Sequence, residues 1–152
     1  MDNFKAELKN IYLYPKDAAA IIIKYKNYFL LQLRDNKPNI FFPNKLSLFG
    51  GAMKKNEKPL NCVQREVREE LNLDLIINKI SYITNVSFEI KKKIINRYIY
   101  LITIDKKDYE KIRISEGQKV EKIEEKFLLN SNLAPYDYLA LWIYLDLGKF
   151  KV

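Results

Sequence analysis

The sequence contains no histidine and only one cysteine, Cys62. Without histidine, a Ser-His-Asp triad, a histidine general base and a histidine-ligated zinc site are excluded, which leaves carboxylates or lysine for proton transfer. A lone cysteine cannot form a disulfide within the chain, and we expect it to be a small buried side chain in a reducing cytoplasm. No run of eighteen apolar residues occurs, and residues 1–17 mix charges of both signs without an apolar core. These absences predict a protein that neither spans a membrane nor carries an obvious export signal.

The length and composition predict one globular domain over residues 1–152. The chain is 48% hydrophobic, which is enough for a proper core, and it shows no internal repeat or low-complexity linker. Its 27 basic residues outnumber its 19 acidic ones, for a formal net charge of +8. This surplus would attract polyanions such as nucleotides or RNA, although a compositional bias toward lysine, asparagine and isoleucine explains it equally well.

The most informative stretch is residues 50–73, which read GGAMKKNEKPLNCVQREVREELNL. Pro59 suits the first turn of a helix and no glycine or proline follows before Leu71, so we predict a helix over residues 59–71. Its apolar residues recur at steps of three and four and would face the core: Leu60, Val63, Val67 and Leu71. Three acids fall together on a neighbouring face: Glu66, Glu69 and Glu70. The helix would therefore pack on the core while its acids point into a cleft.

These three carboxylates repel one another, by roughly 0.2–0.5 kcal/mol per exposed pair and by more when desolvated. A bound cation would remove that cost. Carboxylate oxygens favour Mg²⁺ or Mn²⁺, which usually also take water and substrate phosphates as ligands. The alternative is a solvated acidic face balanced by Arg65 and Arg68.

The full spacing of this stretch closely resembles the signature of the Nudix hydrolases, the MutT-like family. Gly51 is followed by five residues and Glu57, then by seven residues and the pair at 65–66, and the pattern continues through the acids to residue 73. One position departs from the signature, because Asn72 stands where the family has glycine. Asparagine is the next residue most tolerant of a left-handed helix end, so we expect the backbone turn to be preserved.

The resemblance implies an α/β fold, the Nudix α/β/α sandwich with a mixed central sheet. It also implies that a loop and helix bind metal and a diphosphate. The implied metal ligands are Glu66, Glu69, Glu70 and the carbonyl of Gly50. Arg65 would hold these acids in place by pairing with Glu57, and Gly51 would supply the turn. A guanidinium fork is suited to this, since it binds carboxylates bidentately and keeps them ionised.

A second acidic motif lies downstream, at residues 115–118. In MutT-like proteins a Glu-Gly-Gln at this position supplies an extra carboxylate that acts as metal ligand or base, and Glu116 is the candidate here. The alternative is a simple polar turn. Three further acids are held in reserve as candidates should Glu116 point away: Glu121, Glu124 and Glu125.

Alternating and apolar runs predict the remaining elements. Residues 18–34 read as a hairpin with its turn at Lys26 and Asn27, followed by a loop over 35–43. Strands are expected over 46–49, 73–77, 82–88, 98–104 and 119–123, with 82–88 and 98–104 forming a second hairpin. Residues 135–147 read as a final helix stopped by Gly148, with one face directed at the core: Tyr138, Leu141, Trp142 and Leu145.

Four residues are weaker candidates for substrate binding, and each has a structural alternative. Phe41 and Phe42 would stack on a nucleoside or anchor their loop. Arg97 would reach a phosphate or stay solvated at a strand end. Asp137 lies near the position where MutT-like proteins read the base, but an acid is also favoured at a helix N-terminus.

The reaction implied by the resemblance is Mg²⁺-dependent hydrolysis of a phosphoanhydride in a nucleoside diphosphate linked to another group. The Glu-Gly-Gln motif and the compact length favour a nucleoside triphosphate. A nucleotide sugar or the 5′ end of an RNA are the alternatives, and a non-catalytic nucleotide sensor is the alternative outside enzymes. We expect a cytoplasmic monomer or homodimer.

Overall fold

The computed structural model describes residues 16–90 and 92–147. The N-terminal prediction, over residues 1–15, and the helix stop at Gly148 therefore lie outside the described residues. The elements follow in this order: β1 (Ala18–Tyr25), β2 (Tyr28–Leu33), β3 (Leu46–Ser47), β4 (Phe49–Ala52), α2 (Pro59–Leu71), the 3₁₀ turn η1 (Ile77–Lys79), β5 (Ser81–Ile90), β6 (Lys93–Thr103), α3 (Lys106–Lys111), β7 (Lys119–Glu124), α4 (Glu125–Leu128) and α5 (Pro135–Asp146). Within these residues, no helix is both long and apolar enough to cross a membrane.

Strand β1 is the centre of a mixed sheet. It pairs in parallel with β6 along one edge, and β5 lies antiparallel beyond β6. Its other edge is shared by β4, which pairs with residues 18–21, and by β2, which pairs with residues 23–25. Strand β2 then continues the sheet to β3 and β7. The predicted mixed sheet and both predicted hairpins are confirmed.

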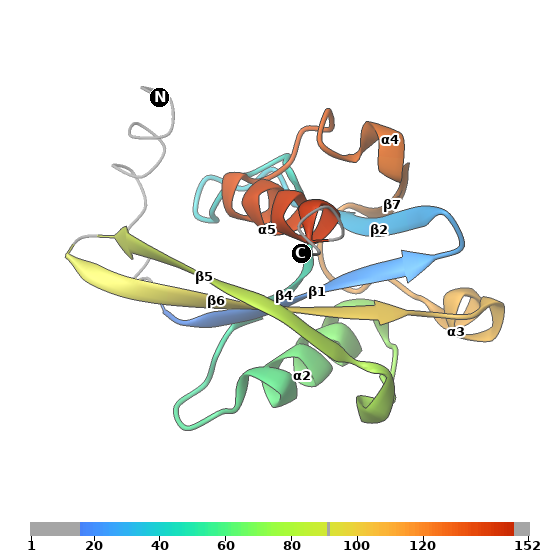
Figure 1. Cartoon of the computed structure of the whole chain (residues 1–152), viewed down its shortest axis with the longest axis horizontal. Helices are drawn as coiled ribbons and strands as arrows, with labels where there is room; N and C mark the ends of the chain where they lie inside the picture. The colour runs from blue at the N-terminus through green and yellow to red at the C-terminus, as the bar shows by residue number, and fades with distance from the viewer. Residues whose placement is uncertain (1–15, 91, 148–152) are drawn as a thin grey trace.

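Helices α2 and α5 cover opposite faces of this sheet (Figure 1). Alternate residues of β1 serve the two layers, because successive side chains of a strand point to opposite faces. Ile21 and Ile23 pack in the cluster that contains Val67 and Leu71 of α2. Ala20 and Ile22 pack in the cluster that contains Leu141 of α5. A strand buried on both faces is therefore the layer from which the α/β/α sandwich is built.

Helix α2 has the predicted bounds. Pro59 occupies its first turn, and Asn72 ends it in the left-handed conformation with φ 53° and ψ 37°. The N–H of Asn72 donates to the carbonyl of Arg68 at 3.0 Å. Asparagine thus performs the turn for which the signature normally has glycine.

Two strand predictions need correction. Residues 73–76 form no strand and lead into η1. Leu73 and Leu75 are buried in the α2 cluster, so their alternation reflected burial and not strand pairing. The expected strand over 46–49 is divided at Leu48, where the chain leaves β2 and joins β1.

The expected core face of α5 is also partly wrong. Leu141 is fully buried, but Trp142 is 44% exposed and Tyr138 is 43% exposed. The helix carries apolar residues on all of its sides, so the periodicity of its sequence could not indicate which side packs on the core.

The left-handed turn at Asn72 generates a prediction. Asn72→Gly should leave stability unchanged or raise it slightly, because glycine adopts this conformation without strain. Asn72→Val should cost about 1–2 kcal/mol, because a β-branched side chain clashes there. Urea denaturation of the two variants checks this, and a valine variant as stable as the wild type would contradict the turn.

The neighbouring residues Leu141 and Trp142 provide a matched pair. Leu141→Ala should destabilise the protein by about 2–5 kcal/mol through loss of buried contacts and the cavity left behind. Trp142→Ala should cost about 1 kcal/mol or less, because much of the indole is already in water. The opposite ranking in thermal denaturation would show that α5 packs through a different face.

Candidate active site

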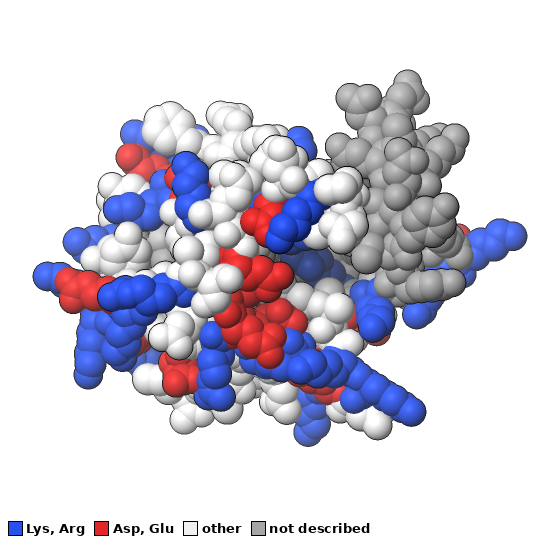
Figure 2. All heavy atoms as spheres, turned by 180° about the vertical axis from the view of Figure 1, so that it is seen from behind, with Lys and Arg blue, Asp and Glu red and all other residues white. Residues whose placement is uncertain are grey.

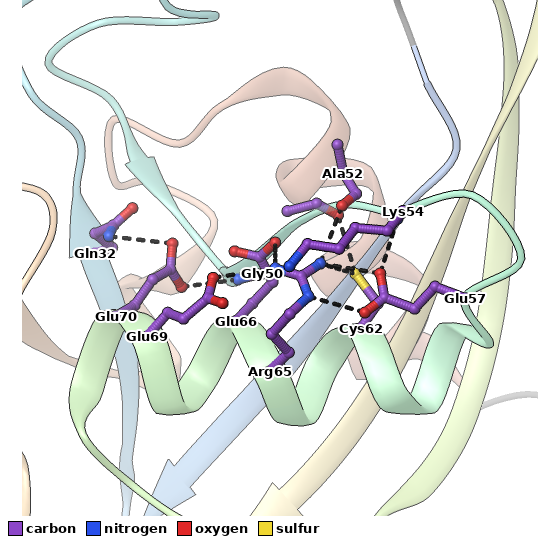
Figure 3. A network of polar contacts seen from close by, with 11 residues as sticks. Gln32, Gly50, Ala52, Lys54, Glu57, Cys62, Arg65, Glu66, Glu69 and Glu70 are labelled. Carbon is purple, nitrogen blue, oxygen red and sulfur yellow. Dashed lines mark hydrogen bonds and ion pairs between the residues drawn. The ribbon is translucent and has the colours of Figure 1, made fainter.

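The guanidinium of Arg65 on α2 connects three glutamates (Figure 3). Its Nε and Nη2 donate to the two carboxylate oxygens of Glu57 at 2.8 and 2.9 Å. Its Nη1 donates to Glu66 at 2.6 Å and to Glu69 at 3.0 Å. The predicted pairing with Glu57 is confirmed, and it is bidentate. These hydrogen bonds lower the pKa of Glu57 to about 2.

Glu70 faces the site from the same helix but lies away from this arginine. Its side chain is only 5% exposed. One carboxylate oxygen accepts from the N–H of Gly50 at 3.0 Å and the other from Nε2 of Gln32 at 3.4 Å. The pKa of Glu70 is raised to about 8, mainly by burial and in part by the charges of Glu66 and Glu116, while the Gly50 N–H and the charge of Arg34 act in the opposite direction.

Glu66 is half-buried, and burial also raises its pKa, with the Arg65 hydrogen bond opposing that change. Glu69 remains largely in solvent, its side chain being 53% exposed. The helix therefore presents one buried acid, one intermediate acid and one exposed acid.

Gly50 and Gly51 bring the end of β4 against these acids. A Cβ on Gly51 would lie 2.6 Å from the carboxylate of Glu66. A Cβ on Gly50, whose φ is +138°, would lie 2.2 Å from the carbonyl oxygen of Ala19. Neither position has room for a side chain. The Gly50 N–H binds Glu70, whereas the role of its carbonyl as a metal ligand stays a prediction.

The segment that carries Glu116 is fixed to the end of α2. The N–H groups of Arg113 and Ser115 donate to the carbonyls of Leu71 and Glu70 at 3.0 and 2.9 Å. They satisfy carbonyls that a helix end leaves without partners. Glu116 itself is exposed, and its charge is among the causes that raise the pKa values of Glu66 and Glu70. The structure thus places Glu116 near enough to the acids of α2 for their charges to interact, while its role as metal ligand or base stays a prediction.

The reserve acids lie in other contacts. Glu121 pairs with Lys119 at 2.5 Å and Glu124 with Lys126 at 3.0 Å. Glu125 is 4.0 Å from Lys24. None of these bonds involves an acid of α2.

Arg97 and Asp137 bind each other, which corrects their expected roles. Nε and Nη2 of Arg97 donate to one oxygen of Asp137 at 3.2 and 2.8 Å, and the N–H of Leu48 donates to the other at 3.1 Å. Asp137 is fully buried and Arg97 only 8% exposed. The aspartate therefore has no face free to read a base. It ties α5 to β6 and to the point where β3 gives way to β4.

The contacts of the two phenylalanines also differ from those expected of side chains that stack on a nucleoside. Phe42 is 3% exposed and packs edge-on against Tyr136, with ring centroids 5.1 Å apart. Phe41 is half-buried beside it, and its carbonyl accepts from Nε of Arg34 at 2.8 Å. The anchoring alternative fits Phe42, whereas a substrate role for Phe41 stays a prediction.

The acids are oxygen donors of the kind that bind a divalent cation, although the side chains as they lie do not form a complete coordination sphere. Among residues 16–90 and 92–147, no three acid, cysteine or histidine side chains stand close enough to hold a metal ion as they lie. The buried acid with its raised pKa and the neighbouring carboxylates nevertheless form a set of hard oxygen donors with excess negative charge. Figure 2 shows acidic side chains gathered in the middle of one face, with lysines and arginines around them. The donors that would hold Mg²⁺ or Mn²⁺ are Glu66, Glu69, Glu70 and Glu116.

Gln32 is the residue of this site that the sequence did not reveal. It comes from β2, 38 positions before Glu70 in the chain. A glutamine at an alternating strand position carries no signal of its own, and only the pairing of β2 beside the helix places it here.

Comparison with known proteins agrees with this geometry. Residues 14–137 match the model of the NUDIX domain. No curated protein sequence matches the chain.

Several solved structures share the fold. The MutT protein from Methanosarcina mazei Go1 superposes with a TM-score of 0.72 at 20% identity, covering 91% of this chain and 99% of that chain. The E. coli ORF135 protein gives 0.71 at 20%, covering 90% and 94%. An Ap4A hydrolase from C. elegans gives 0.67 at 19%, covering 89% and 99%. At such identities the likeness establishes the fold alone, whereas the domain match covers more than half of the chain. The protein therefore belongs to the Nudix hydrolase family.

Proposed function

We propose that this Nudix hydrolase uses Mg²⁺ or Mn²⁺ to cleave a phosphoanhydride in a nucleoside diphosphate linked to another group. The observation that carries the proposal is the acidic cluster of α2, in which one arginine pairs with three glutamates while buried Glu70 lacks a cationic partner among the described residues. When bound there, the metal neutralises the diphosphate and makes a water molecule more acidic.

The protein's own groups would position and deprotonate the attacking water. Histidine is absent, which leaves carboxylates or lysine, and the carboxylates of this cluster are the natural bases. Glu66 and Glu116 are the two candidates. Glu66 is oriented by Arg65 at 2.6 Å, whereas Glu116 is exposed and open to substrate and solvent.

A nucleoside triphosphate is the substrate that we favour. The Glu116 motif and the compact length support it, and a structural neighbour is named as a dihydroneopterin triphosphate pyrophosphohydrolase. Dinucleoside polyphosphates are also candidate substrates, because one structural neighbour is named as an Ap4A hydrolase. The net charge of +8 supports a second candidate, the 5′ end of an RNA. The phosphorylated product that accompanies the released group separates these options, because a nucleoside triphosphate yields a free nucleoside monophosphate with pyrophosphate, whereas a triphosphorylated RNA yields a 5′-monophosphorylated RNA. We further propose that the protein works in the cytoplasm, as a monomer or homodimer.

Glu69 offers the cleanest test of the metal site. Its side chain is 53% exposed, so Glu69→Gln should keep the fold while removing a ligand. We expect turnover to fall at least about 100-fold, since the lost charge is one that the metal requires. The measurement is Mg²⁺-dependent hydrolysis of triphosphates, nucleotide sugars, dinucleoside polyphosphates and 5′-triphosphorylated RNA, followed by identification of the products.

Glu110→Gln is the matched control, because Glu110 lies on α3 in a solvated pair with Lys106 and should leave turnover unchanged. Near-normal turnover of Glu69→Gln would rule out the proposed ligand set. A folded wild-type protein that binds nucleotides and returns them unchanged would favour the sensor.

The Glu57 pair predicts how stability depends on pH. The folded-state pKa of Glu57 is about 2 against an ordinary 4.5, so its ionised form stabilises the protein fully above pH 4.5 and progressively less as the pH falls toward 2. Glu57→Gln should therefore cost about 1 kcal/mol at neutral pH. That difference from the wild type should shrink between pH 4.5 and 2 in urea denaturation. A difference independent of pH would mean that the pair contributes through packing.

A further inference from the structure

Gln32 is a buried polar residue that the proposed chemistry does not use. It lies on β2, is only 3% exposed, and points toward Glu70 (Figure 3). Its Nε2 donates to the side chain of Glu70 at 3.4 Å and to the backbone carbonyl of Glu116 at 3.0 Å. The backbone carbonyl of Glu116 can only accept, so the NH₂ end of the amide must face it. One nitrogen, through its two hydrogens, thus connects helix α2 to the segment that carries the extra acid.

Gly117 fits this amide closely. A Cβ at position 117 would lie 2.8 Å from Cγ of Gln32 and 2.9 Å from its Nε2. The φ of Gly117 is +84°, which other residues rarely adopt. Glycine therefore follows Glu116 because the glutamine needs that space to reach the Glu116 carbonyl.

The flanks of this segment have their own anchors. Ser115 donates its N–H to the carbonyl of Glu70 at 2.9 Å, and Gln118 donates its N–H to Leu33 at 2.9 Å. At Glu116 itself, the bond from Gln32 is the single hydrogen bond seen among the described residues. The amide thus controls how close the middle of the segment lies to α2.

We infer that Gln32 is a positioning residue, which holds the Glu116 backbone against Glu70 so that the Glu116 carboxylate joins the acids of α2 in binding the metal. This inference rests on the proposed function, because it assigns Glu116 a part in that site. Gln32 acts through Glu116 and touches no substrate. Its removal should therefore weaken metal binding chiefly while residue 116 is an acid, with a smaller part lost through its longer bond to Glu70.

A double-mutant cycle tests this requirement with a readout separate from turnover. Calorimetric titration with Mn²⁺ compares the wild type, Gln32→Met, Glu116→Gln and the double variant. Methionine keeps the size of glutamine but has no donor. Gln32→Met should weaken Mn²⁺ binding about tenfold, as is typical when an outer partner of a metal ligand is lost, and Glu116→Gln, which removes a ligand, should weaken it at least as much. The double variant should bind nearly as well as Glu116→Gln alone, since most of the effect of Gln32 passes through the Glu116 carboxylate and only the longer bond to Glu70 is independent of it.

Two further variants test whether the loss of Mn²⁺ binding is specific to the Gln32 amide. Gln64→Met is the matched control, because the Gln64 amide reaches the carbonyl of Leu75 at 3.5 Å, and it should leave Mn²⁺ binding unchanged. Gly117→Ala displaces Gln32 from the other side. It should reproduce the loss seen for Gln32→Met, including its dependence on Glu116, and it serves if the methionine variant does not fold.

The outcomes separate this inference from the proposed function. Wild-type binding by Gln32→Met, or its full tenfold loss on the Glu116→Gln background, would overturn the inference even if the enzyme hydrolyses its substrate. A cycle with the expected pattern in a protein that hydrolyses nothing would uphold the inference and reject the proposed function. Absence of Mn²⁺ binding by the wild type would overturn both.

Discussion

The Arg65 guanidinium donates to three glutamates at once, and the acidic site depends on this contact. Its fork fixes Glu57 bidentately, which orients the plane of the guanidinium and leaves Nη1 to reach Glu66 and Glu69. Nη2 also donates to the carbonyl of Ala52 at 3.2 Å, which joins the helix to the end of β4. A lysine would supply the charge without this planar set of donors. One side chain thus holds both the acids and the turn in front of them.

The arginine nevertheless neutralises only part of the charge that it organises. Glu70 is held by two neutral donors, Gln32 and the Gly50 N–H, and its buried carboxyl resists ionisation. Glu116 adds negative charge from the segment between α3 and β7. This imbalance would be an unexplained cost in a purely structural cluster. Nudix hydrolases generally use divalent metal ions, and the imbalance is consistent with the proposal that such a cation supplies the missing positive charge here.

The parts of the fold that could be predicted are those fixed by local patterns. Helix α2 followed from Pro59, its uninterrupted length and its apolar stripe, and Asn72 could be placed because few residues tolerate a left-handed turn. The face of α5 could not be found, since a helix that is apolar all round, including Trp142, has no periodic signal. The residues from Leu73 onward likewise predict a strand, whereas Leu73 is buried in the core without pairing as a strand.

Parts of the site that depend on distant contacts were beyond the sequence. Arg97 and Asp137 are 40 positions apart, and the sequence offers each a substrate role or a local structural one because nothing in the chain shows that they bind each other. Gln32 likewise binds the backbone of Glu116 across 84 positions, and nothing in the sequence indicates that contact. By contrast, the spacing of residues 51–73 identified the acids correctly as one group, because their geometry is set within a single helix.

The most direct test of this account is the titration of the Glu70 carboxyl, followed by carbon NMR with Glu70→Gln to assign its signal. The account predicts a pKa of about 8 without metal, and a fall toward the ordinary 4.5 when Mg²⁺ is added. A pKa near 4.5 without metal, or one that saturating Mg²⁺ leaves unchanged, would contradict the claim that this buried acid awaits a cation.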